Sequence, residues 1–549
     1  MFACEVDPTL KTMSFKELDE LSNQVADSLR RPLADGGLGL VYGDAAGICM
    51  PMSPEAVAIY LGIVKAGCAV VSIADSFSAQ EIETRMRLSH AKALFTQDVV
   101  YRAAKYLPLF ERVLHFGDFA HVVILPGRNN TLHPSVLSHM RPQLDISWET
   151  FMKGASTTFE TVSCPSDHIC NILFSSGTTG EPKAIPWTHA TPIKCAVDGF
   201  LHQDIKVGEV VAWPTNLGWM MGPWLLFQMI NGASIALFGG VTSTDLFCKF
   251  VEESKVSMLG VVPSLVKSWW ALNATEKCDW SGVTRFSSSG EASDPTASLW
   301  LMSRAHYHPV IEYCGGTEVA GSYLSSTMVQ PNVPSMFSTP VLGNNFTIID
   351  DEGASVDQGE IALIPPALGL STRLLNRDHN ECYFFGMPAG PCGEVLRKHG
   401  DEIQRVRWAG GQAYNLPLDS SKGDSFYYRA LGRCDDTMNL GGIKVSSVEI
   451  ERVCNEVPGV LETAAIGVSP PGGGPSRLII FAIVHADLQA EMTADKLKGL
   501  LQQSVKTLLN PLFHVGEVVL AEKLPRTASN KVMRRVIRDD YLKIVAAKK

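Results

Sequence analysis

Apolar and polar positions in the first 330 residues follow a repeating order of helix-like and strand-like spacing. The sequence SFKE at residues 14–17 is typical of a helix start, and apolar residues then recur every three or four positions. A second helix is predicted from about residue 54 to residue 66, and an apolar run follows at residues 68–73. Further short apolar runs continue this order at residues 237–238, 258–262 and 310–313. Such alternation predicts α/β layers built on parallel sheets.

The pattern changes at about residue 335 and again after residue 432. The first change brings short β-like runs that predict a small antiparallel unit, at residues 346–349, 361–364, 382–385 and 426–428. The second brings a mixture of helices and strands, predicted at residues 447–457, 463–468, 478–484, 497–508 and 518–520. We therefore expect an α/β protein with a large N-terminal domain, residues 1–433, of layered sheets and a small β-barrel-like unit. A small α+β domain would occupy residues 434–549.

Composition narrows the classes of function. The 549 residues carry a net charge of −10, which argues against a general nucleic-acid binder because no basic surface would attract a phosphate backbone. The 13 cysteines include no CxxC pair, so reduced thiols in an intracellular compartment are favoured over disulfides or a zinc site. The first residues predict no signal peptide, and the apolar stretch 219–240 contains polar residues that favour core or pocket wall over a membrane span.

The loop FSSGTTGEPKA, residues 174–184, carries the clearest candidate chemistry. It follows an apolar, strand-like run at residues 169–174 and holds four hydroxyl side chains, two glycines and a lysine. Glycines let backbone N–H groups approach an anion, hydroxyls donate hydrogen bonds to phosphate oxygens, and Lys183 adds a positive charge. The loop lacks the GK[ST] ending of a Walker A motif, so a P-loop fold does not follow. Taken alone, the loop also fits a solvated turn.

Five further segments rich in glycine and polar residues follow in order along the chain. They are SSGEA at 288–292, YCGGTE at 313–318, GD at 423–424, GRCDDTMNLGGIK at 432–444 and LPRTASNK at 524–531. Together with the loop, these motifs resemble the adenylate-forming superfamily of acyl- and aryl-CoA synthetases, luciferases and peptide-synthetase adenylation domains. The resemblance covers nearly the whole chain and is strongest to the acetyl-CoA-synthetase-like branch, which includes plant acyl-activating enzymes.

The resemblance implies an enzyme that activates a carboxylic acid with ATP, magnesium and coenzyme A. The carboxylate attacks the α-phosphate of ATP to give acyl-AMP and pyrophosphate, and the thiol of coenzyme A then displaces AMP. Such a transfer needs positioning and charge neutralisation more than covalent catalysis. Two alternatives remain: an enzyme that passes acyl-AMP to another acceptor, and a degenerate homologue that only binds nucleotide.

The same resemblance assigns roles to individual residues. The nucleotide would be held by Ser175, Ser176, Thr178, Thr179, Lys183, Gly290, Glu291, Ala292, Asp424 and Arg433. Thr317 would contact the α-phosphate, Glu318 would hold Mg²⁺, and Lys531 would reach the reacting carboxylate from the small domain. Asp435 would be the hinge about which the small domain turns. That rotation would bring Gly441, Gly442 and Lys444 to the coenzyme A side.

Departures from the family pattern concern the ribose site and the acyl pocket. Residues 421–424 read SKGD instead of the usual YxTGD, so the aspartate is kept while the aromatic residue and the threonine are not. Gly315 stands where acetate-restricted relatives carry tryptophan, so we expect an acid larger than acetate, such as a medium-chain fatty or aryl-aliphatic acid. Trp219 and its neighbours would form pocket wall, although ordinary core is an equally good interpretation: Trp213, Met220, Met221 and Trp224.

The expected partner is a small carboxylic acid, with neither nucleic acid nor a membrane span; the oligomeric state is not predicted. Family resemblance suggests the peroxisome, but residues 547–549, AKK, are not an SKL-type address. The cytoplasm is the alternative compartment.

Overall fold

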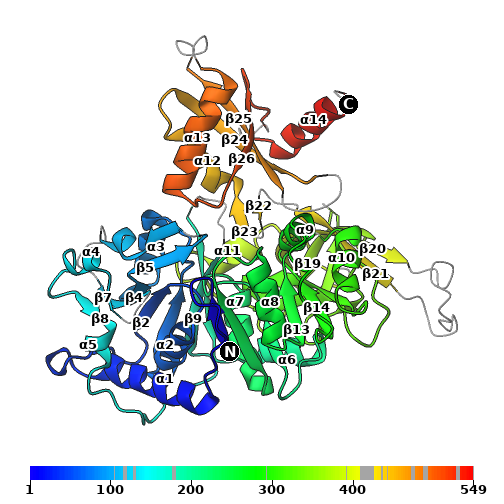
Figure 1. Cartoon of the computed structure of the whole chain (residues 1–549). Coiled ribbons are helices and arrows are strands. Elements are labelled where there is room, and N and C mark those ends of the chain that lie inside the picture. The colour runs from blue at the N-terminus through cyan, green and yellow to red at the C-terminus, as the bar shows by residue number, and fades with distance from the viewer. Residues whose placement is uncertain are drawn as a thin grey trace.

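The computed structural model shows a large body that carries a smaller one above it (Figure 1). It describes residues 1–103, 105–114, 120–127, 131–175, 181–291, 293–350, 352–390, 392–407, 426–433, 437–441, 443–470, 476–485, 492–526 and 532–547. The described residues include no helix that is long and apolar enough to span a membrane.

The first half of the large body is built on a seven-stranded sheet. Its strands, in spatial order, are β10 (Lys183–Thr188), β9 (Ile169–Ser175), β3 (Ala69–Ser72), β2 (Ala45–Cys49), β4 (Ala91–Gln97), β7 (His121–Leu125) and β8 (Asp145–Ser147). All pairs are parallel except β9 with β10. Helices and short elements around it are α1 (Phe15–Arg30), α2 (Pro54–Lys65), α3 (Ala79–Leu88), α4 (Pro134–Leu137), α5 (Trp148–Met152), η1 (Leu33–Asp35), η2 (Phe110–Val113), β5 (Val99–Arg102) and β6 (Lys105–Pro108).

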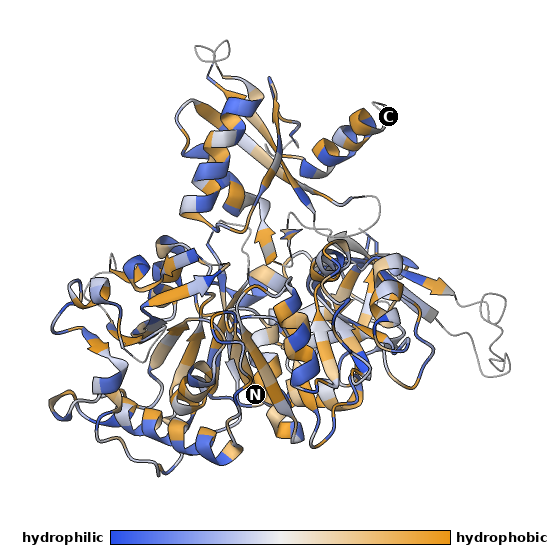
Figure 2. Cartoon of the chain, viewed as in Figure 1, coloured by the Kyte–Doolittle hydropathy of each residue, from blue (hydrophilic) through white to orange (hydrophobic). Residues whose placement is uncertain are grey.

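Helices α1 and α2 begin where the local sequence predicted them. The Ser14 side chain accepts from the Glu17 amide, and the Glu17 side chain accepts from the Ser14 amide, so the predicted capping box starts α1. The Ser53 side chain caps α2, and Gly67, at φ +72°, lies just beyond its end. Figure 2 shows hydrophobic residues concentrated in the strands of the large body, where they form several buried clusters.

The second half is built on an eight-stranded sheet. Its strands, in spatial order, are β1 (Phe2–Cys4), β12 (Ser234–Gly239), β11 (Val210–Ala212), β13 (Met258–Val261), β14 (Arg285–Ser288), β15 (Val310–Gly316), β16 (Gly321–Ser325) and β17 (Thr339–Pro340). The sheet is parallel as far as β15 and antiparallel beyond it. Its helices are α6 (Thr191–Leu201), α7 (Met221–Phe227), η3 (Gln228–Asn231), α8 (Asp245–Glu253), α9 (Pro263–Ala271), α10 (Pro295–Ser303) and η4 (Thr317–Val319).

The predicted antiparallel unit is present but differs from expectation in two places. Its four strands are β18 (Phe346–Ile349), β19 (Gln358–Leu363), β20 (Arg397–Arg407) and β21 (Phe426–Arg433). The strand expected at residues 382–385 is wrong: residues His379–Tyr383 form helix α11, because the Asp378 side chain caps the Glu381 amide. Strand β20 was missed because most of its residues are charged or polar.

The small domain packs helices against a three-stranded sheet. It consists of the hairpin β22 (Thr437–Leu440) and β23 (Ile443–Ser446), α12 (Ser447–Asn455), β24 (Val460–Val468), β25 (Arg477–Val484), α13 (Ala494–Leu508), β26 (Val515–Leu520) and α14 (Arg534–Ala547). Leu497, Leu501 and Val505 of α13 are buried, whereas Leu500 is 42% exposed. An ion pair of 3.2 Å between Arg452 and Glu81 ties this domain to α3.

Candidate active site

A cavity of about 2660 Å³ lies where the carboxyl ends of strands from both sheets approach the small domain. Open α/β sheets commonly bind ligands at this edge. Several of the predicted site residues line it together: Ser175, Lys183, Trp219, Gly290, Glu291, Gly315, Thr317, Glu318 and Gly441. These residues are spread over more than 260 positions of sequence, so the fold alone brings them together.

Other predicted residues lie outside the described part of the chain. These are Ser176, Thr178, Thr179, Ala292, Asp424, Asp435, Gly442 and Lys531. Arg433 ends β21 and Lys444 lies in β23, but only their backbones are described.

Glu318 is the centre of a polar cluster on the cavity wall. It lies in η4, directly after β15. Its Oε1 accepts hydrogen bonds from the Ser175 hydroxyl at 2.8 Å and the Tyr383 hydroxyl at 3.3 Å, and it lies 3.2 Å from Lys183 Nζ. Two residues of the predicted phosphate loop therefore meet the predicted metal ligand.

The charge around Glu318 keeps this carboxyl ionised. Burial alone would raise its pKa, but the positive charges of Lys183 and His399, together with the Ser175 hydrogen bond, hold that pKa well below its usual range. The guanidinium of Arg397, itself fully buried, adds to this effect and lies 3.9 Å from the centre of the Tyr383 ring. Lys183 Nζ lies 4.8 Å from the same ring centre. An ionised carboxylate beside several cations suits a site that handles phosphate and a hard cation.

The Glu291 side chain is engaged inside the protein. Its two oxygens accept from the backbone amide and hydroxyl of Ser264, at 2.8 and 3.0 Å, near the start of α9. Gly290, at φ +91°, makes the turn that precedes it. The segment thus lines the cavity while its carboxylate is hydrogen-bonded to the start of a neighbouring helix.

Sequence reasoning missed a second glutamate, Glu312. It is buried in β15 and lines the cavity. Its Oε2 accepts from the Ser293 hydroxyl at 2.7 Å, whereas its buried Oε1 has no hydrogen-bond partner at bonding distance among the described residues. Burial raises its pKa to about 8. The available signal was a charged residue inside the apolar run of residues 310–313.

Asp401 is the other residue that sequence reasoning missed. It lines the cavity, accepts a 2.6 Å hydrogen bond from the Tyr323 hydroxyl and lies 3.2 Å from His399 Nε2. In the sheet it stands directly opposite Arg433. The signal was the dipeptide Gly400–Asp401, which repeats the dipeptide at 423–424 but sits in a strand without the usual flanking threonine.

Gly315 is closed in by backbone. A Cβ atom at this position would lie 1.9 Å from the Gly321 carbonyl oxygen, across the β15–β16 pair. A tryptophan here would therefore have to displace β16. Among the predicted wall residues, Trp219 contacts the cores of both domains, and the buried Trp213 lies over Gly260, where a Cβ would meet its ring at 2.0 Å.

Comparisons with known proteins agree with this geometry. Residues 3–367 match the family described as AMP-binding enzyme, and residues 449–531 match the AMP-binding enzyme C-terminal domain. The chain is 48% identical over 512 residues to the probable acyl-activating enzyme 17, peroxisomal, of Arabidopsis thaliana, covering 91% of this chain and 68% of that protein. It is 49% identical over 515 residues to hexanoyl-CoA synthase of Cannabis sativa, covering 92% of this chain and 68% of that protein.

Solved structures share the fold at lower identity. The acetoacetyl-CoA synthetase from Streptomyces lividans superposes with a TM-score of 0.67 at 21% identity, covering 97% of this chain and 78% of that one. The anthranilate CoA ligase AuaEII, in complex with anthranoyl-AMP, superposes with a TM-score of 0.65 at 22% identity. The match covers 100% of this chain and 94% of that one. The chain therefore belongs to the AMP-binding enzyme family, within the adenylate-forming superfamily that its motifs resemble.

Proposed function

We propose that this protein is an AMP-forming acid–CoA ligase. A carboxylic acid attacks the α-phosphate of ATP, releasing pyrophosphate and forming acyl-AMP; the thiol of coenzyme A then attacks the acyl carbon and AMP leaves. The observation that carries the proposal is the contact of Ser175, Lys183 and Glu318 in a cavity between two domains. Relatives named as acyl-activating enzymes and CoA synthases support it.

Lys183 and Glu318 divide the handling of the triphosphate between them. Lys183 is close enough to the cavity to pair with phosphate oxygens. Glu318 offers the carboxylate oxygen that Mg²⁺ prefers, and Mg²⁺ usually takes its remaining ligands from phosphate and water. The residues present therefore fit the ion, which when bound neutralises phosphate charge. Thr317, at the same turn, would contact the α-phosphate.

Two residues outside the predicted set complete the nucleoside site. Oε1 of Glu312, which has no hydrogen-bond partner among the residues that the structure describes, fits a donor such as the exocyclic amine of adenine; guanine has an oxygen there. Asp401, opposite Arg433, fits the ribose hydroxyls. We assign the ribose role to Asp401 in place of Asp424. Asp401→Asn should then raise the KM for ATP at least about 10-fold, while Asp424→Asn leaves it within about 3-fold; the reverse result would restore Asp424.

The small domain supplies the second half of the reaction. We place the domain boundary between residues 433 and 434 and the hinge at Asp435. The tip of the β22–β23 hairpin, at Gly441, lines the cavity, which suits a surface along which a thiol enters. Lys531 is proposed to act on the α-phosphate during adenylation. Lys531→Ala should therefore abolish adenylation and leave thiolysis of supplied acyl-AMP largely intact.

The acid is proposed to be larger than acetate. Aromatic and methionine side chains on the cavity wall favour an apolar acyl group: Trp213, Trp219, Met220 and Met221. A relative at 49% identity is named hexanoyl-CoA synthase, so medium-chain acids are the first class to test. Because two close relatives are named peroxisomal, we propose the peroxisome as the compartment, to be checked by imaging a fluorescent fusion.

A pyrophosphate-release screen tests the proposal. Straight-chain acids of graded length and aryl-aliphatic acids are each supplied with ATP, Mg²⁺ and purified protein, with and without coenzyme A. Acid-dependent pyrophosphate release together with thioester formation supports a CoA ligase. Pyrophosphate release without thioester would favour a different acyl acceptor, and no release with any acid would favour a protein that only binds nucleotide.

A further inference from the structure

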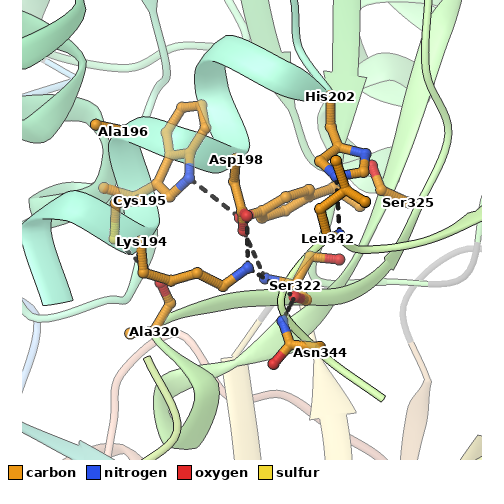
Figure 3. Close-up of polar contacts among 12 residues, drawn as sticks. Lys194, Cys195, Ala196, Asp198, His202, Ala320, Ser322, Ser325, Leu342 and Asn344 are labelled. Atoms are coloured by element: carbon orange, nitrogen blue, oxygen red, sulfur yellow. Dashed lines mark hydrogen bonds and ion pairs between the residues drawn. The ribbon is translucent and has the colours of Figure 1, made fainter. Parts of the chain in front are cut away.

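A buried ion pair lies behind the cavity wall, on helix α6. Lys194 and Asp198 are one helical turn apart, both are fully buried, and Lys194 Nζ lies 2.5 Å from Asp198 Oδ1. Figure 3 shows both side chains directed toward Ser322. Burying two charges is expensive, and such a pair often adds little to stability compared with apolar residues of the same size. The pair therefore calls for a role other than stabilising the core.

The remaining hydrogen bonds of the pair go to both strands of one hairpin. Asp198 Oδ2 accepts from the Tyr313 hydroxyl of β15 at 2.6 Å and from the Ser322 amide of β16 at 3.1 Å. Lys194 Nζ also donates to the Ser322 carbonyl at 3.2 Å. One carboxylate and its counterion thus hold the two strands that flank the turn bearing Thr317 and Glu318.

Two neighbouring contacts strengthen this attachment. The Cys195 thiol donates to the Ala320 carbonyl at 3.0 Å, so α6 also holds the end of the turn (Figure 3). Gly321 makes the close approach possible, because a Cβ there would lie 2.5 Å from Asp198 Oδ2 and 3.0 Å from the Tyr313 hydroxyl. The distance between α6 and the β15–β16 hairpin is therefore fixed by close contacts that leave no room for a side chain at Gly321.

We propose that Lys194 and Asp198 are positioning residues for adenylation. They fix the turn at residues 317–320 against α6, so that the Glu318 carboxylate stays within reach of Ser175 and Lys183. The inference rests on the proposed function of Glu318. A displacement of reacting groups by about 1 Å can cost about 100-fold in rate, so loosening this turn should slow the step that uses Glu318 and spare the step that does not.

The test compares half-reactions in matched variants. Asp198→Asn keeps the shape but removes the charge that holds Lys194 and Ser322. We expect it to lower kcat for acid-dependent ATP–pyrophosphate exchange about 30-fold or more, with KM for ATP and thiolysis of supplied acyl-AMP each within about 3-fold. The control is Lys249→Met with Glu253→Gln, an exposed pair at the same helical spacing, which should change nothing.

A second readout is independent of the reaction. Amide hydrogen exchange in the segment 313–322 should be at least about 10-fold faster in Asp198→Asn, with distant segments unchanged. Unchanged exchange in this segment, or equal loss in both half-reactions, overturns the inference. If Asp198→Asn does not fold, Tyr313→Phe removes one hydrogen bond to Asp198, together with the one that the Tyr313 hydroxyl accepts from Trp224 Nε1, and must show the same selective loss at smaller size. A wild-type protein without exchange activity would refute the proposed function, and hydrogen exchange would still decide the role of the pair.

Discussion

Glu312 and Glu318 lie six positions apart on one strand and the turn that follows it, yet their surroundings drive their pKa values in opposite directions. Burial raises the pKa of Glu312 to about 8, since no cation in the described part of the chain is close enough to offset it. Burial acts in the same sense on Glu318, but Lys183, His399 and Arg397 reverse the outcome and hold its pKa well below the usual range.

The different protonation states of the two glutamates explain how one cavity can recognise both a base and a charged triphosphate. At neutral pH, Glu312 is a neutral acid that both donates and accepts, which suits the edge of a base. Glu318 is a charged group suited to a cation and phosphates. The cations that separate the two roles lie on strands distant in sequence, β10 and β20.

Within the comparison of the two glutamates, the largest effect is expected from Glu318→Gln. Glutamine keeps the size of the side chain but cannot balance Lys183 or attract Mg²⁺. We expect kcat for acid-dependent ATP–pyrophosphate exchange to fall at least about 100-fold, equivalent to about 2.7 kcal/mol. Thiolysis of supplied acyl-AMP should fall far less. A loss below about 10-fold in the exchange assay would contradict the role of Glu318.

The same replacement at Glu312 should change the catalytic efficiency with ATP only slightly. Glutamine imitates a protonated carboxyl, so Glu312→Gln should stay within about 3-fold of wild type in kcat/KM for ATP at pH 6.5. Glu312→Leu leaves the base without a partner and should lose about 10-fold, with weaker discrimination of ATP from GTP. Equal losses for both Gln variants, at 312 and 318, would show that the two carboxyls are not in different protonation states.

Part of this contrast was accessible from sequence. The strand before the loop at 174–184, the cap of α1 and the helix α2 were predicted because their signals are local. Glu318 was predicted by family resemblance. The protonation of Glu312 was not, because it depends on which charged groups fold against it. Lys194 and Asp198 have the spacing of an ordinary surface pair, and only tertiary packing shows them buried.

The same reasoning explains the errors in the β unit. Residues 382–385, CYFF, have strong strand propensity. The Asp378 side chain caps the residues just before them, however, and this favours the helix α11. Strand β20 is charged because one of its faces supplies the site: Arg397 acts on Glu318, and Asp401 lines the cavity. A functional strand of this kind violates the alternation that identifies strands.

The pH dependence of the free energy of unfolding gives a third test. Because the pKa of Glu312 is higher in the folded chain than its ordinary value of 4.5, its contribution to the free energy of unfolding falls as pH rises from about 4.5 to about 8. The slope is at most about 1.4 kcal/mol per pH unit. Urea unfolding of Glu312→Gln should show this slope removed. An unchanged pH profile would contradict the raised pKa of Glu312.

Glu318 should act with the opposite sign. Its lowered pKa gives a contribution that is present above about pH 4.5 and is lost as pH falls further. Glu318→Gln should therefore weaken the acid sensitivity of the protein below about pH 4.5 while leaving the pH dependence above pH 5 as in wild type. A variant whose acid unfolding matches that of wild type would refute this sign.

The smallest effect is expected from Tyr383→Phe. The hydroxyl donates a 3.3 Å hydrogen bond to Glu318, whereas the ring that contacts Lys183 and Arg397 is kept. We expect a loss of at most about 3-fold in exchange activity, in line with one weak hydrogen bond. A loss comparable to that of Glu318→Gln would mean that the hydroxyl, and not the surrounding charge, sets the behaviour of Glu318.

The most direct test of the account is a single-turnover experiment with ATP, Mg²⁺ and a medium-chain acid. The reaction is followed first without coenzyme A and then after its addition. The account predicts that enzyme-bound acyl-AMP and pyrophosphate accumulate in equal amounts and that coenzyme A converts the acyl-AMP into acyl-CoA and AMP. Formation of ADP in place of pyrophosphate, or acyl-AMP that coenzyme A leaves untouched, would contradict it.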